Sequence, residues 1–178
     1  WARTLGLPAE AAAFAGVIAA LCGWNIVHLK HLSLAAVAAW TPWLMAGIEL
    51  ALRGERTRPA LRIGLAVGMM GLAGNPTALY YSLLVAAVNV TLGAILARHP
   101  RPIAIALRGL LLGLLLGAMQ LAPTADFLGH SSRKVGLTFE QANSLGFHPK
   151  HLWMFVSPFA YGDPAHGTPY RGPEAFPD

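Results

Sequence analysis

Three ionisable side chains stand close together early in the chain, between two long apolar segments: His28, Lys30 and His31. At a membrane surface these groups could donate charge-assisted hydrogen bonds to a phosphate group, which are stronger than neutral hydrogen bonds. In the structural alternative, Lys30 extends its charged end to water and both histidines are ordinary interfacial residues. The i, i+3 spacing of the histidines also suits two metal ligands, but no third ligand is identifiable. The sequence therefore predicts no firm cofactor and leaves a divalent metal as an alternative.

A second polar cluster follows the last apolar segment and comprises Asp126, Ser131, Ser132 and Arg133. The planar guanidinium of Arg133 could hold a phosphate group, with the serine hydroxyls as further donors. Asp126 is the candidate catalytic residue, because its carboxylate could bind an acceptor hydroxyl, help to hold a metal ion or orient the arginine. In the structural alternative, Asp126 and Arg133 form an ion pair that fixes the loop to the rest of the molecule. Both interpretations stay open.

A turn sequence, Gly74-Asn75-Pro76, joins two further apolar segments. The segment before it, residues 60–74, is short and spans only about 22 Å at 1.5 Å per residue. If the turn lies within the membrane, protein or a water-filled cavity must satisfy its backbone. Asn75 and Tyr80 would then line an outward cavity and contact a substrate. The alternative makes Asn75 an ordinary turn residue and Tyr80 an interfacial anchor.

The elements that position these residues are apolar segments long enough for transmembrane helices. About 20 apolar residues cross a hydrocarbon core about 30 Å thick. Residues near 9–29, 32–52, 60–74, 77–97 and 107–125 meet or approach this length, and 55% of the chain is hydrophobic against 12% charged. The sequence predicts an all-α fold, a polytopic transmembrane helical bundle of about five spans within residues 1–125. A polar extracytoplasmic loop region, residues 126–178, follows it.

The arginines predict which way the bundle faces. Four of them, Arg53, Arg56, Arg58 and Arg62, flank one connection, and Arg98, Arg101 and Arg108 flank another. By the positive-inside rule both connections lie in the cytoplasm. The turn at residues 74–76, the connection at residues 28–31 and everything after residue 123 then lie outside.

The last third of the chain is predicted to contain a short helix and an interfacial segment. A helix is expected from Thr138, because Thr138 and Gln141 have capping-box spacing. Residues 151–160 are rich in aromatic side chains and too short to span a membrane. Residues 163–178 are predicted to be loop.

Other features of the sequence predict packing or exclude functions. Glu49 is expected to pair with Arg53 at i+4, and the glycines at 109, 113 and 117 predict close helix packing. Cys22 is the only cysteine, which excludes a disulfide within the chain. The cations form no stripe with interleaved aromatics, so nucleic acid is not a predicted partner. The chain starts at Trp1 without a signal-peptide pattern, and we interpret it as an internal part of a longer protein.

Several sequence blocks, in the same order and spacing, resemble the YfhO-type bacterial membrane proteins. These belong to the GT-C class of polytopic glycosyltransferases that use lipid-linked sugars. The blocks are Gly23–Leu29, Trp40–Leu44 with Glu49, Gly74–Tyr81, Gln120–Leu128 running into Ser131–Arg133, Leu137–Glu140, and Phe155–Phe159 with Tyr161-Gly162.

The resemblance implies a multi-pass enzyme of the bacterial cytoplasmic membrane that transfers a sugar from a polyprenyl-phosphate donor. Its expected partners are membrane lipid, the lipid-linked sugar donor and an envelope polymer or lipid acceptor. Such enzymes carry an essential acidic residue in the first outer loop, which would lie upstream of this chain. A cation such as Arg133 would stabilise the departing lipid phosphate. The alternatives are a transporter or flippase for a lipid-linked or anionic substrate, with its site at the 74–76 turn, and a structural subunit of an envelope-assembly complex.

Overall fold

The computed structural model describes residues 1–55, 57–130, 136, 138, 148–163 and 166–172, and it is all-α. Contacts divide the chain into two compact units, Trp1–Phe127 and Leu128–Asp178. The elements in chain order are α1 (Ala9–Leu21), α2 (Gly23–Val27), η1 (His28–Lys30), α3 (Leu32–Leu52), α4 (Thr57–Leu72), α5 (Pro76–Leu96), α6 (Arg101–His130) and η3 (Pro149–Phe155).

Four helical stretches of the described chain are long and apolar enough to cross a membrane: Ala9–Lys30, Leu32–Leu52, Pro76–Leu96 and Arg101–His130. The remaining predicted span, residues 60–74, corresponds to α4, which has 16 residues and a length of about 24 Å. Although it is the shortest of the bundle helices, α4 carries much of the core. Met70 and Ala66 are fully buried, and Ile63 and Val67 are nearly so.

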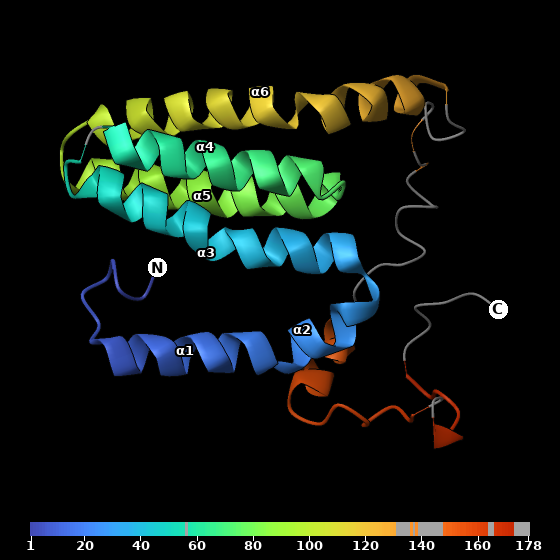
Figure 1. Ribbon diagram of the computed structural model, residues 1–178. Coiled ribbons are helices and arrows are strands. Elements are labelled where there is room, and N and C mark those ends of the chain that lie inside the picture. The colour runs from blue at the N-terminus through green and yellow to red at the C-terminus, as the bar shows by residue number, and fades with distance from the viewer. Residues whose placement is uncertain (56, 131–135, 137, 139–147, 164–165, 173–178) are drawn as a thin grey trace. The chain divides into compact units, whose positions relative to one another are not determined.

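Helices α3, α4, α5 and α6 form an up-down-up-down bundle (Figure 1). Helices α3 and α5 are parallel, because Ser33 contacts Asn75 near their first residues and Leu52 lies against Gly93 near their last. Midway along this pair, the hydroxyls of Thr41 and Ser82 share a hydrogen bond of 3.3 Å. Polar contacts of this kind connect helices where water is absent.

Helices α4 and α6 are also parallel and pack through glycine. A Cβ built on Gly113 would lie 2.5 Å from Val67 Cβ and 2.9 Å from the Gly64 carbonyl oxygen. At the next turn the Cα of Gly71 lies 3.5 Å from the Cβ position of Gly117. The prediction that these glycines serve close helix packing is confirmed.

Each of two helices contains a proline whose neighbouring threonine bonds to the preceding turn. In α3, Thr41 precedes Pro42 and its hydroxyl donates to the Val37 carbonyl at 3.1 Å. In α6, Thr124 follows Pro123 and its hydroxyl donates to the Gln120 carbonyl at 2.7 Å. Proline has no backbone N–H to donate. A nearby hydroxyl that donates to a carbonyl of the preceding turn therefore helps a membrane helix to continue past the proline.

The course of α6 corrects two predicted boundaries. The helix begins at Arg101 rather than near residue 107, since proline at the second position, Pro102, suits a first helical turn. It continues to His130, so Asp126 lies on the helix and not in a loop after residue 125. The placement of Asp126 in a loop was therefore wrong.

The predicted segment 9–29 is not one continuous helix. Cys22 has extended backbone dihedrals and separates α1 from α2, and the side-chain amide of Asn25 donates to the Ala19 carbonyl at 2.5 Å. The amide thus satisfies one of the carbonyls that the break would leave without a partner. None of the residues of α1 is buried.

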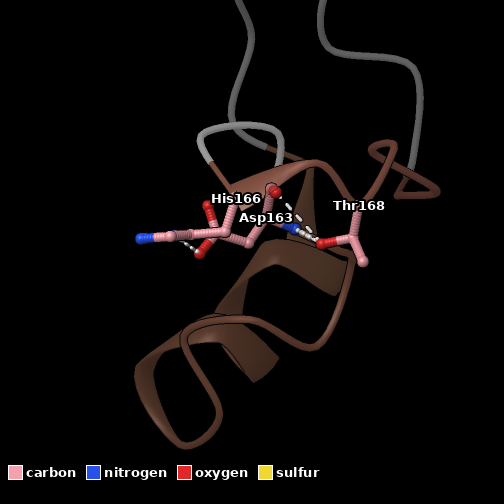
Figure 2. A network of polar contacts seen from close by, with 3 residues as sticks. All are labelled: Asp163, His166 and Thr168. Atoms are coloured by element: carbon pink, nitrogen blue, oxygen red, sulfur yellow. Dashed lines mark hydrogen bonds and ion pairs between the residues drawn. The ribbon is translucent and has the colours of Figure 1, made fainter.

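The second unit contains η3 and a loop that returns to it. His151 is buried, accepts from the His148 amide through Nδ1 at 3.1 Å, and its Nε2 lies 2.7 Å from the Tyr170 hydroxyl. Figure 2 shows a second contact network in this loop, in which the Thr168 hydroxyl accepts from the Asp163 amide at 2.8 Å and donates to its carbonyl. His166 Nδ1 lies 2.5 Å from the Asp163 carboxylate. The helix predicted from Thr138 falls mainly on residues 139–147, outside the described residues.

Candidate functional site

The first candidate site lies at the end of the bundle where α3 and α5 begin, here named the Asn75 end. Asn75 is the N-cap of α5, and its side-chain oxygen accepts from the Ala78 amide at 3.0 Å. Its amide nitrogen is 3.5 Å from Ser33 Oγ, at the limit of hydrogen-bond distance. One asparagine therefore both starts α5 and contacts the first turn of α3.

The α4–α5 turn also approaches α6 at this end. Gly74 has a φ of +72°, which glycine adopts at little cost, and its Cβ position lies 3.6 Å from Gln120 Nε2. The Gly74 amide donates to the Gly71 carbonyl at 3.2 Å. Because Gly74 and Asn75 make these local hydrogen bonds, the turn needs no water-filled cavity to satisfy them.

His28, Lys30 and His31 lie immediately before α3. His28 donates from Nδ1 to the Trp24 carbonyl at 2.7 Å and stacks on the Trp24 ring with 4.5 Å between centroids. With the ring proton on Nδ1, Nε2 of the neutral His28 ring is a hydrogen-bond acceptor. Lys30 and His31 are exposed, and Ser33 follows two residues after His31. The structure thus brings the 28–31 segment to the Asn75 end through Ser33.

Tyr80 lies one turn into α5 and borders an apolar cavity. The cavity has a volume of about 390 Å³, is open on one side and is lined by parts of α3, α4, α5 and α6. Its lining includes Leu44 of α3, Val67 of α4, Val90 of α5 and Leu110 of α6. The only hydroxyls among its lining residues are those of Tyr80 and Thr91. A cavity of this composition suits a hydrocarbon chain rather than a polar ligand.

The remaining predicted site residues are not gathered at this end. Asp126 lies on an exposed part of α6, six residues beyond Gln120, which corresponds to about 9 Å along a helix. Ser131, Ser132 and Arg133 lie outside the described residues, so their predicted roles stay predictions. Within the part of the chain that the structure describes, no group of three or more histidine, cysteine or carboxylate side chains could hold a metal ion.

Sequence reasoning missed Ser33 and the position of Gln120. Ser33 stands among apolar residues at the start of α3 and forms no motif with its neighbours. Gln120 lies within an apolar segment, and only the tertiary structure shows that it reaches the Gly74 turn. The signal available in sequence is that both polar residues lie close to the same predicted membrane surface.

Comparison of the chain with known protein families, with curated proteins and with solved structures finds no match.

Proposed function

We propose that this chain is the membrane-embedded part of a bacterial glycosyltransferase that takes a sugar from a polyprenyl-phosphate donor. The acceptor is an extracytoplasmic polymer or lipid of the cell envelope. The single observation that carries this proposal is the contact between Asn75 and Ser33, because it gathers polar groups from two separate connections at one surface of an apolar bundle.

The Asn75 end offers several groups that suit a phosphate head group. Lys30 supplies a positive charge, and Ser33, Asn75 and Gln120 supply neutral hydrogen-bond donors. The apolar cavity bordered by Tyr80 lies deeper along the same helices and suits the polyprenyl chain. A head group at the surface and a tail between helices is the arrangement that a lipid-linked donor requires.

The proposed chemistry is displacement at the anomeric carbon of the donor sugar. A carboxylate accepts the proton of the acceptor hydroxyl as the new glycosidic oxygen–carbon bond forms, and the bond to the lipid phosphate breaks. By the resemblance, that carboxylate lies upstream of this chain, with Asp126 the candidate within it. Arg133 and Ser131 stabilise the departing phosphate.

The transporter alternative placed its binding site in a broken helix at residues 74–76. The turn found there makes its own backbone and capping hydrogen bonds, as usual between two helices. Residues 74–76 therefore join two helices and do not break one, and with the sequence resemblance we favour the transferase.

We further propose that α4 also spans the membrane, with Arg53–Arg62 in the cytoplasm and the Asn75 end outside. The chain would be labelled with a membrane-impermeant maleimide on intact cells, in a Cys22→Ser background. We expect Thr77→Cys to react on intact cells and Glu55→Cys to react only after the membrane is opened. These two exposed residues flank α4 on either side, so reaction of both from one side would exclude α4 as a span.

A further inference from the structure

A second pocket lies at the opposite end of the bundle, where α3 and α5 end and α6 begins. It has a volume of about 250 Å³. Its polar side chains are Arg53, His99 and Arg101, and its apolar lining includes Leu52, Pro102 and Ile105. We call it the arginine pocket. Nothing in the proposed transfer reaction uses it.

Each polar side chain that lines the arginine pocket carries hydrogen-bond donors. Arg53 uses Nε for an ion pair with Glu49 at 2.9 Å, which leaves its two terminal nitrogens as donors. His99 accepts from the Arg101 amide through Nδ1 at 3.0 Å, so its neutral ring carries the proton on Nε2. Within the described residues, no carboxylate forms an ion pair with Arg101.

The helix ends around the pocket have part of their carbonyl oxygens hydrogen-bonded within the chain. After α3, the Gly54 amide donates to Ala51 and the Glu55 amide to Leu50, each at 3.1 Å. After α5, the Arg98 and His99 amides donate to Ile95 and Ala94, each at 3.0 Å. Both helices thus end in closed turns of the Schellman type, each of which satisfies two carbonyls of the last helical turn.

The arginine pocket is positive overall and has an apolar wall. Two guanidinium groups and one imidazole line it, no carboxylate is among its lining residues, and Glu49 pairs with Arg53. Guanidinium groups bind phosphate through planar pairs of hydrogen bonds. The apolar residues on the other side suit the carbon atoms attached to a phosphodiester. Basic pockets between membrane helices are typical binding places for anionic lipid head groups.

We propose that the arginine pocket binds a phosphate group, held by Arg53, Arg101 and His99. The two sources of such a group are the phosphodiester of an anionic phospholipid and a free phosphate ion. Binding there would hold together the ends of α3, α5 and α6, far from the Asn75 end.

The test uses native mass spectrometry of the full-length protein, purified and then supplied with phosphatidylglycerol or phosphatidylcholine of the same acyl chains. We expect tighter binding of phosphatidylglycerol to the wild type, and about tenfold weaker binding to an Arg53→Ala/Arg101→Ala variant. The matched control is Arg58→Ala/Arg108→Ala, which removes two exposed arginines outside the pocket. We expect this control to change the affinity less than twofold.

Inorganic phosphate in the millimolar range distinguishes the two sources. If phosphatidylglycerol stays bound to the protein in the presence of phosphate, the site is assigned to lipid. If phosphate itself binds and this binding is lost in the Arg53→Ala/Arg101→Ala variant, the site is assigned to the free ion. Equal affinity for both phospholipids without phosphate binding, or an equal loss in the control variant, would overturn the proposal. If the alanine variant does not fold, Arg53→Lys/Arg101→Lys keeps the charge, and weaker phosphate or lipid binding by it still supports the paired hydrogen bonds. Unchanged binding by that variant would contradict them.

Discussion

Replacing Gly113 by leucine is expected to separate α4 from α6 and to prevent stable folding of the bundle. The Cβ of any residue at this position would lie 2.5 Å from Val67 Cβ and 2.9 Å from the Gly64 carbonyl. Neither atom is the end of a flexible side chain, so the helices must move apart. Overpacking typically costs about 1–3 kcal/mol, and we expect at least the upper end of this range here. Heating in detergent followed by size-exclusion chromatography measures the loss.

The matched control is Gly129→Leu in the same helix. Nothing lies within 4 Å of a Cβ at Gly129, and leucine favours helix over glycine by roughly 0.5–1 kcal/mol. We therefore expect the control to be as stable as the wild type or slightly more stable. An equal loss of stability in both variants would show that the α4–α6 contact is not the cause. A fully stable Gly113→Leu variant would show that the helices do not pack this closely.

Replacing Arg133 by alanine is expected to reduce sugar transfer by about 100- to 1000-fold, the usual effect of removing a group that stabilises developing negative charge. The readout is the turnover of a lipid-linked sugar by the full-length protein, compared at equal amounts of inserted protein. Arg133→Lys should recover part of the activity, because it restores the charge but not the paired hydrogen bonds.

The structural alternative for Arg133 makes a different prediction. If Arg133 and Asp126 form only a stabilising ion pair, the neutral pair Asp126→Asn/Arg133→Gln should keep most of the activity. Lys134→Ala, which removes the neighbouring positive charge, serves as control and should change turnover only a few-fold. Retained activity in the neutral pair would return both residues to a structural role.

The sequence alone predicted where the helices lie better than it predicted which helices pack against one another. The apolar segments 32–52 and 77–97 correspond closely to α3 and α5, because in both cases polar turn residues limit an apolar run. The pairing of Glu49 with Arg53 was also predictable, since it joins residues one turn apart. The break at Cys22 was not, because nothing in its apolar surroundings distinguishes extended from helical backbone.

The arrangement of the helices depends on contacts that apolar sequence does not encode plainly. Helices α3 and α5 are apolar on most sides, so hydrophobic periodicity does not identify the buried face. The central place of α4 follows instead from its glycines, which fit against those of α6. The contact between Ser33 and Asn75 joins residues 42 positions apart and is visible only in the folded chain.

Cleavage of a polyprenyl-phosphate sugar by the full-length protein tests the proposed function most directly. The protein would be placed in lipid nanodiscs with a panel of polyprenyl-phosphate donors carrying radiolabelled sugars, together with an envelope fraction as acceptor. The transferase proposal predicts that at least one donor is converted to free polyprenyl phosphate, at a rate that is proportional to protein and lost in Arg133→Ala. If every donor stays chemically intact while proteoliposomes containing the protein move it between leaflets, the protein is a transporter and the proposal is wrong.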